Sequence, residues 1–273
     1  MLEPGLMLWA ERDQLDMARS LGVRYGQLGI PGGMQLTDAV AAHWKAALEA
    51  ASFTLVTVFA AYEGEDYSDI PAVARTVGFV PPDTRQARLA RTLAVSDFAA
   101  QLAVPSIACH VGFVPEDPAH ADYLAVRHMV RLVCDHAARY GQTFALETGQ
   151  EPAPVLLGFI RDVDRPNLRI NFDPANLILY GTGEPIAALQ TLAPLVISVH
   201  CKDGDWPPAG VSGALGTERP LGKGSVNIAR FVETLRNIGF RGPLNVERET
   251  DDQPQRWRDL ADGVALVRAL AQP

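Results

Sequence analysis

Acidic and imidazole side chains follow several short apolar segments of the chain, at the point where each segment ends. The clearest case is the segment 195–199, which runs directly into His200 and Lys202. A short β-branched run of this kind predicts a buried parallel strand, and residues two apart on a strand point to the same side. Other segments end in the same way, at His110, Glu147, Asp173 and Glu247. Because ligands bind beyond the carboxyl ends of parallel strands, we expect these side chains to meet in one site.

Four of these residues form a set that suits a divalent cation: Glu147, Asp173, His200 and Glu247. Three carboxylates and one imidazole fit one Mn²⁺, our first expectation, or Mg²⁺, Co²⁺ or Zn²⁺. Cys201 adjoins His200 and should face the other side of its strand, so no thiolate joins the set. The alternative is that each carboxylate caps a helix or pairs with a nearby cation. A cluster of carboxylates without compensation is costly, which favours the metal.

The elements that would position these residues alternate regularly between strands and helices. We expect strands over 5–10, 23–30, 53–62, 104–110, 142–147, 167–173, 195–200 and 243–247. We expect helices over 11–21, 39–51 (capped by Asp38), 82–102, 118–140, 152–161, 174–192 with a break at 181–185, 227–238 and 255–271. Strict alternation implies parallel strands with right-handed crossovers, and eight such units close into a barrel. The predicted fold is therefore α/β, a (β/α)8 TIM barrel formed by one domain over residues 1–273.

Composition excludes several classes of function. The chain has 273 residues, is 48% hydrophobic and carries a net charge of −8, so we expect no nucleic-acid partner. The N-terminal region has no basic segment, and no apolar run is long enough for a membrane span. The three cysteines are widely spaced without a CxxC motif, which favours reduced thiols. We therefore predict a cytoplasmic protein.

Two loops have compositions that indicate a function. Residues 61–81 form the longest irregular stretch and contain Tyr62, Tyr67 and Phe79, which favours a lid over disorder. The segment 221–227, LGKGSVN, places two glycines before a helix, as phosphate-binding loops do, but it lacks the full phosphate-loop motif.

The chain resembles the xylose isomerase-like TIM barrels, which include sugar and sugar-phosphate isomerases, ketose epimerases, inosose dehydratases and endonuclease IV. The resemblance covers nearly the whole chain and is most specific in ETGQE (147–151), NFDPAN (171–176), VHCKDG (199–204), LGKGSVN (221–227) and NVERE (245–249). In the ketose epimerases, Glu, Asp, His and Glu at the ends of strands five to eight hold the metal. The matching residues here are Glu147, Asp173, His200 and Glu247. The resemblance also implies a homodimer or homotetramer.

The resemblance implies further roles within this site. It makes Glu147 and Glu247 the catalytic acid/base pair as well as metal ligands. Asn176 stands where the family has a substrate-binding histidine, and Trp206 stands where an arginine usually follows the histidine ligand. The candidate substrate-binding residues are His110, Glu151, Asn176, Lys202, Trp206 and Tyr62. Glu249 lies two residues past Glu247 and so on the same side, where it would support a ligand or instead pair with Arg248 or Arg219.

This set of residues predicts a divalent-metal-dependent sugar isomerase or epimerase. An ion that chelates a carbonyl and the neighbouring hydroxyl stabilises an enediolate, and a carboxylate removes and returns the proton. We expect a ketose, a keto-sugar or a related polyol as substrate. The alternative is a dehydratase or lyase acting on a keto-inositol or 3-keto-sugar, because the HxKD pattern at 200–203 is closer to inosose dehydratases. Less expected are an endonuclease of abasic DNA, which needs a histidine-rich multi-metal cluster, and a non-catalytic sugar-binding barrel.

Overall fold

The computed structural model describes residues 2–11 and 14–272 of the chain. Its barrel strands are β1 (Glu3–Trp9), β2 (Tyr25–Ile30), β3 (Thr54–Ala60), β4 (Ser106–Cys109), β5 (Thr143–Glu147), β6 (Leu168–Phe172), β7 (Val196–Cys201) and β10 (Pro243–Val246). A separate pair of strands is formed by β8 (Asp203–Asp205) and β9 (Thr217–Arg219). The helices are α1 (Leu15–Ser20), α2 (Asp38–Ala51), α3 (Ile70–Thr76), α4 (Arg85–Gln101), α5 (Ala121–Ala138), α6 (Ala153–Val163), α7 (Pro174–Leu179), α8 (Pro185–Leu192), the 3₁₀ turn η1 (Ala193–Leu195), α9 (Ile228–Asn237) and α10 (Gln253–Ala271).

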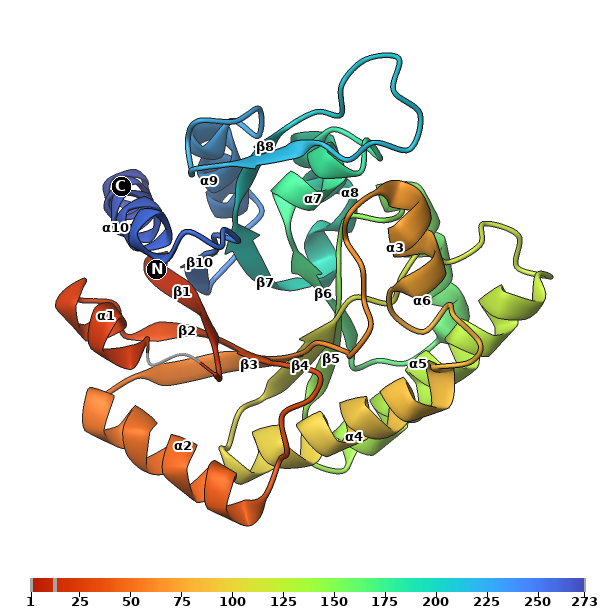
Figure 1. Ribbon diagram of the computed structural model, residues 1–273, viewed down its shortest axis with the longest axis horizontal. Helices are drawn as coiled ribbons and strands as arrows, with labels where there is room; N and C mark the ends of the chain where they lie inside the picture. Colours follow the sequence, from red (N-terminus) through yellow and green to blue (C-terminus); the bar gives the residue numbers. More distant parts are fainter. Residues whose placement is uncertain (1, 12–13, 273) are drawn as a thin grey trace.

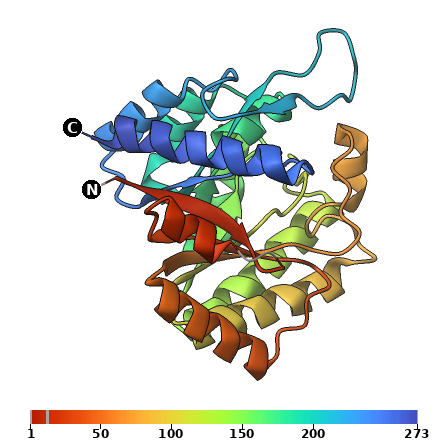
Figure 2. The ribbon, with the colours of Figure 1, turned by 60° about the vertical axis from the view of Figure 1, so that its left-hand side comes forward.

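Eight parallel strands of the described chain close into a barrel in the order β1-β10-β7-β6-β5-β4-β3-β2. Closure is made by β1, which pairs in parallel with β2 on one side and with β10 on the other. Figure 1 shows the helices outside this ring of strands, and Figure 2 shows α10 lying along β1. The predicted (β/α)8 barrel is therefore confirmed.

Alternation along the strands separates the interior of the barrel from the layer under the helices. In β1, Leu6 and Leu8 pack in the large core between strands and helices, whereas Met7 packs inside the barrel against Phe59. The helices supply the matching apolar stripes: α9 buries Ile228, Phe231, Val232 and Leu235, spaced for one face of a helix. This packing holds the carboxyl ends of the strands, where the predicted site residues lie.

The loops that cover these strand ends contain elements that the sequence pattern did not predict. The stretch 61–81 includes α3, whose first turn is capped by Asp69, which accepts a hydrogen bond from Ala72 N at 2.6 Å. The loop 204–224 includes the antiparallel β8–β9 pair. A third difference concerns the cap of α2: the side chain of Thr37, and not the predicted Asp38, accepts from the amide of Val40.

Two covering segments from distant parts of the chain meet over the barrel. Ile70 N at the start of α3 donates to Gly213 O, in the loop between β8 and β9, at 2.9 Å. Val73 and Val77 pack with Tyr180 at this contact, and Leu215 packs against them. Figure 1 shows α3 beside this loop. The 61–81 stretch therefore covers the site, and its movement as a lid stays a prediction.

The lengths and compositions of the helices can be compared with what a membrane span requires. Among residues 2–11 and 14–272, none of the helices combines the length and the apolar character that crossing a bilayer requires.

Candidate metal centre

The ends of β5, β6, β7 and β10 bring together Glu147, Asp173, His200 and Glu247. One potential ligand atom from each of the four lies within 4.8 Å of all the others. His200 Nδ1 is 3.1 Å from Glu247 Oε2, 3.2 Å from Glu147 Oε1 and 3.7 Å from Asp173 Oδ2. All four side chains are buried, with residue exposures of 0 to 6%. The structure thus assembles the four predicted ligands into one cluster.

The hydrogen bonds of Asp173 show why helix capping does not account for this cluster. Its Oδ1 accepts from the amides of Ala175 and Asn176 at 2.8 and 3.0 Å and so caps α7. Its Oδ2 is buried and, among the described residues, accepts no hydrogen bond; the buried Oε2 of Glu247 instead faces two cationic groups, with His200 Nδ1 at 3.1 Å and Lys202 Nζ at 3.3 Å. A buried carboxylate oxygen without a donor is costly, and a divalent cation beside Asp173 Oδ2 would compensate that cost. The donor set therefore fits a metal ion.

The protonation of His200 follows from the same crowding. Burial alone would lower the pKa of His200, but the negative charges of Glu247 and Glu147 outweigh burial and hold that pKa well above its ordinary value. For Glu247 the balance is reversed: burial would raise its pKa, and His200 and Lys202 lower it below its usual range. The imidazolium therefore neutralises part of the carboxylate charge, and a metal held by these residues would take the place of its Nδ1 proton.

Lys202 lies beside this cluster as a second buried cation. Its Nζ is 3.3 Å from Glu247 Oε2 and 2.7 Å from Glu249 Oε2. Burial would lower the pKa of Lys202, but Glu247 and Glu249 raise it well above the ordinary value, so the amine carries its charge. Glu249 therefore pairs with Lys202 rather than with Arg248 or Arg219, and that lysine links Glu249 to the ligand Glu247.

A cavity of about 420 Å³ opens above the cluster and is lined by Glu147, Glu247, Lys202 and Glu249. His110 and Asn176 also line it, as the sequence predicts. The remaining lining residues are Met7, Trp9, Phe59, Ala61, Glu65, Tyr67, Leu179, Tyr180, Leu215, Gly216 and Glu218. The volume lies within the range of small-molecule sites, and the apolar walls would limit access of water.

His110 and Asn176 both approach the ligand Glu147. Asn176 Nδ2 donates to Glu147 Oε1 at 3.1 Å, and His110 Nε2 lies 3.8 Å from the same oxygen. The amide of Gln150 lies 3.3 Å from His110 Nδ1. An amide that donates to Nδ1 leaves the ring proton on Nε2, the nitrogen nearer Glu147.

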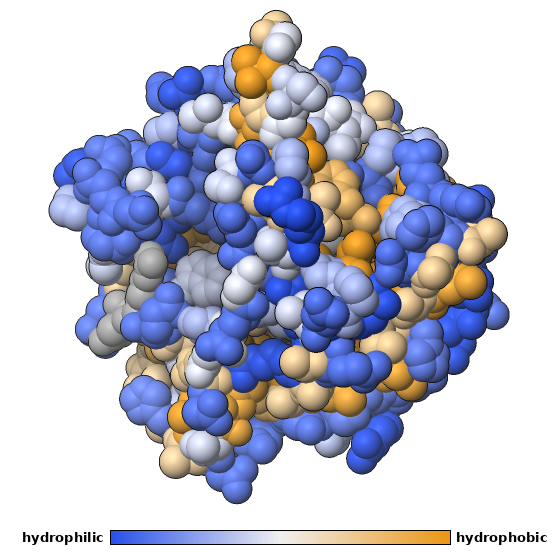
Figure 3. Space-filling view, turned by 45° about the vertical axis from the view of Figure 1, so that its right-hand side comes forward, coloured by the Kyte–Doolittle hydropathy of each residue, from blue (hydrophilic) through white to orange (hydrophobic). Residues whose placement is uncertain are grey.

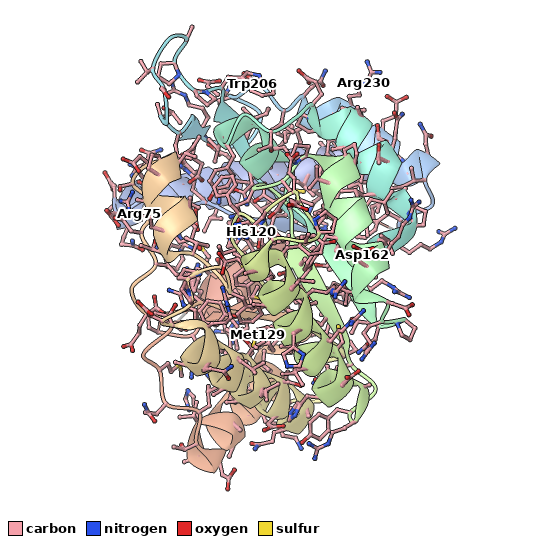
Figure 4. All side chains as sticks on the ribbon, turned by 90° about the vertical axis from the view of Figure 1, so that its right-hand side faces the viewer. Arg75, His120, Met129, Asp162, Trp206 and Arg230 are labelled. Carbon is pink, nitrogen blue, oxygen red and sulfur yellow. The ribbon has the colours of Figure 1, made fainter. Side chains whose placement is uncertain are left out.

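Three residues predicted to bind substrate do not line this cavity. The hydroxyl of Tyr62 bonds to Thr92 Oγ1 at 2.7 Å in the core outside the barrel. Glu151 is buried and accepts from Val114 N at 2.8 Å, and burial raises its pKa to about 7. Trp206 is 39% exposed on the loop between β8 and β9. Figure 4 shows it at the outer edge of the molecule, and Figure 3 shows apolar surface on the loop that projects there.

The sequence pattern does not predict several of the cavity residues, because their positions depend on strands and helices that the pattern does not reveal. Glu218 belongs to β9; its carboxylate accepts from Glu249 N at 3.0 Å and pairs with Arg248 at 3.0 Å. Burial and the charge of Glu249 raise the pKa of Glu218 to about 7, although Lys202 acts in the opposite direction. Tyr67, in the covering stretch 61–81, is a cavity residue for which the sequence does give a signal.

The LGKGSVN segment holds an anion, but that anion is a carboxylate of the protein itself. Asp203 accepts hydrogen bonds from the amides of Gly222, Gly224 and Val226, each at 3.0 Å. The amides that resemble a phosphate loop are therefore already occupied, and none of residues 221–227 lines the cavity. The segment fixes the turn that follows β7 and thereby the position of Lys202.

These observations define a class of protein: a closed parallel barrel that carries a cluster of carboxylates and a histidine at the carboxyl ends of its strands. The sequence matches the family described as xylose isomerase-like TIM barrel over residues 15–269, so the chain belongs to this family. It is similar to the crystal structure of a xylose isomerase domain protein from Planctomyces limnophilus, with 42% identity, a TM-score of 0.94, and coverage of 98% of this chain and 97% of that one.

More distant structures share the fold. A probable 3-DHS dehydratase, AsbF, from Bacillus anthracis has 17% identity and a TM-score of 0.69, over 97% of this chain and 98% of that one. A D-psicose 3-epimerase from Clostridium cellulolyticum H10 has 17% identity and a TM-score of 0.70, over 99% of this chain and 100% of that one.

Among curated sequences, an uncharacterized protein from Methanocaldococcus jannaschii is 28% identical over 95 residues, which are 34% of this chain and 30% of that protein. The match therefore spans less than a third of that relative's length.

Proposed function

We propose that the protein is a divalent-metal-dependent sugar isomerase or epimerase that moves a proton on a carbon next to a carbonyl group. The observation that carries this proposal is the pairing of Glu147 and Glu247 in one buried cluster below a sugar-sized cavity. The two carboxylates come from β5 and from the end of β10, which are separated by β6 and β7 in the barrel. They can therefore approach a bound sugar from different sides.

The ion would be held by Glu147, Asp173, His200 and Glu247, with Mn²⁺ as first candidate and Mg²⁺, Co²⁺ or Zn²⁺ as alternatives. When bound, it would polarise the substrate carbonyl and its neighbouring hydroxyl and thereby lower the pKa of the adjacent C–H.

The side chains around the cavity would perform the proton transfer. One of the two carboxylates, Glu147 or Glu247, removes the proton, and the same or the opposite carboxylate returns it. Asn176 holds Oε1 of Glu147 in place through its 3.1 Å hydrogen bond. Lys202, charged and next to Glu247, would donate to a substrate oxygen on which negative charge develops.

The charges of the cavity favour a sugar without phosphate. Its described lining contains the carboxylates Glu65, Glu147, Glu218, Glu247 and Glu249. The single lysine of that lining, Lys202, is already paired with two of them. A substrate phosphate would meet repulsion in a site of low dielectric constant, without an arginine fork to bind it. We therefore propose an uncharged ketose, keto-sugar or related polyol as substrate.

A dehydratase or lyase acting on a keto-inositol or 3-keto-sugar is the second candidate, and the position of His110 favours it. Its Nε2 lies 3.8 Å from Glu147 Oε1, so an imidazole able to donate a proton would stand next to a candidate base. Elimination needs such a pair, since the departing oxygen must receive a proton when the C–H proton is removed.

One experiment separates these reactions. Metal-loaded protein is incubated in D₂O with a panel of ketoses, keto-inositols and 3-keto-sugars, and products are analysed by mass spectrometry. Incorporation of deuterium without loss of water supports isomerisation or epimerisation, and loss of water supports the lyase. Chelator-treated protein and Glu147→Gln are the controls and should be inactive. Binding without either reaction across the panel would contradict an enzymatic function and favour a sugar-binding barrel.

A further inference from the structure

A cluster of polar side chains lies inside the barrel below the metal centre. It consists of Gln27 from β2, Asn171 from β6 and Ser198 from β7, which we call the polar floor. Gln27 and Asn171 are 0% exposed and Ser198 is 3% exposed. Burial of amides costs free energy unless each polar atom is hydrogen-bonded, so an interior of this kind needs a reason beyond packing.

The hydrogen bonds of the polar floor fix the orientation of the Gln27 amide. Its Nε2 donates to Ser198 Oγ at 2.8 Å and to Asn171 Oδ1 at 2.9 Å, which uses both amide hydrogens. Its Oε1 therefore points the other way, and it lies 3.1 Å from His200 Nε2. Because an amide oxygen can only accept, this hydrogen bond requires a proton on Nε2.

The second neighbour of His200 Nε2 is consistent with this assignment. Asn171 Nδ2 lies 3.2 Å from the same nitrogen and 3.4 Å from Glu147 Oε2. With a proton on Nε2, the Asn171 amide cannot donate to the ring and donates to the carboxylate instead. The polar floor thus contacts two of the four candidate ligands, the imidazole through Gln27 and a carboxylate through Asn171.

Irregularities in the strand pairing coincide with these residues. The β2–β3 register shifts between Gly26 and Gln27, and the β6–β7 register shifts between Ile170 and Asn171. Such bulges redirect side chains and are frequent next to active sites. The local backbone of the barrel therefore departs from regular pairing at the positions that place the two amides under His200.

We propose that Gln27 is a positioning residue for the metal centre, an inference that rests on the proposed metal dependence. By accepting the Nε2–H of His200, it holds the imidazole in the tautomer whose Nδ1 lone pair faces Glu147, Asp173 and Glu247. A hydrogen bond to the second ring nitrogen fixes the orientation of a histidine ligand and raises the basicity of the nitrogen that binds the metal.

The test compares metal affinity in wild type, Gln27→Met and Thr57→Val. Methionine keeps the approximate volume of glutamine and removes the acceptor. Thr57 pairs with Gln27 in the barrel register, and its buried hydroxyl has no hydrogen-bond partner among the described residues, so its replacement is a matched control. Competition with a fluorescent chelator for Mn²⁺ or Zn²⁺ should show affinity about 10- to 100-fold weaker in Gln27→Met and unchanged in Thr57→Val. Circular dichroism checks that both variants fold.

A second readout does not depend on any variant of Gln27. In ¹⁵N-histidine-labelled wild type loaded with diamagnetic Zn²⁺, the ring-nitrogen shifts of His200, assigned with His200→Ala, should show a protonated Nε2 and a metal-bearing Nδ1. A proton on Nδ1, or equal metal affinity in folded Gln27→Met and wild type, would overturn the role of Gln27 alone. Absence of metal binding in wild type would overturn the proposed function and this inference together.

Discussion

Replacement of Glu151 by glutamine should change how the stability of the protein depends on pH. The Glu151 carboxyl is buried, and burial raises its pKa from 4.5 to about 7 despite the hydrogen bond from Val114 N. A raised pKa means that the folded protein binds this proton more tightly than the unfolded chain does. The protonated Glu151 carboxyl therefore makes its full contribution to the unfolding free energy below pH 4.5, and this contribution is lost as the pH rises through 7.

The size of the effect follows from the shift. About 2.5 pKa units at roughly 1.4 kcal/mol each correspond to about 3 kcal/mol of unfolding free energy. Glutamine keeps an oxygen for Val114 N and has no charge to bury. The stability of Glu151→Gln relative to wild type should therefore rise by about 3 kcal/mol between pH 4.5 and pH 8.

Urea unfolding followed by circular dichroism, at a series of pH values with chelator present, measures this difference. Chelator removes any contribution of a bound ion, and the other titrating groups cancel between wild type and variant. Glu116→Gln, which alters an exposed carboxyl on the loop before α5, is the control and should give a flat difference. A difference for Glu151→Gln that is equally flat would refute the assignment of a buried, largely protonated carboxyl.

Other expected outcomes test the surroundings of the site. Lys202→Met should leave Glu247 and Glu249 without their buried cation, so turnover of any substrate found should fall by at least 100-fold. Lys223→Met, which removes an exposed lysine, should keep the turnover of wild type. Equal turnover in both variants would contradict a role for the Lys202 amine. Asp203→Asn should lower the unfolding free energy by about 3 kcal/mol, because the Asp203 carboxylate accepts hydrogen bonds from four backbone amides. Urea unfolding of both variants tests this: a loss as small as that in Asp205→Asn, whose half-buried carboxylate accepts from no backbone amide in the described chain, would contradict it.

The barrel and its four-residue cluster could be predicted from the sequence because both depend on local patterns. Short apolar runs define the strands, and residues directly after a parallel strand must lie at the same end of the barrel. The cluster therefore forms independently of the loop conformations; its members are Glu147, Asp173, His200 and Glu247. Their function as ligands stays a prediction.

The walls of the cavity could not be predicted, since they depend on contacts between distant loops. Glu218 reaches the cavity only because β9 pairs with β8, and neither three-residue strand has a detectable period. The resemblance predicts Trp206 at the site, where the family has an arginine after the histidine ligand, but the β8–β9 pair places Trp206 on the outer loop, 39% exposed. Gln27 was missed for another reason: a single amide inside an apolar strand gives no signal until its partners on β6 and β7 are known.

Metal content tests the central claim most directly. Wild type, Glu147→Gln and His200→Ala are purified without chelator, incubated with Mn²⁺, desalted and analysed by inductively coupled plasma mass spectrometry. The structure predicts about one divalent ion per chain in wild type and its loss in both variants, because each removes one of four converging ligands. Wild type without metal, or an ion that both variants retain, would contradict the metal centre and the sugar chemistry proposed for it.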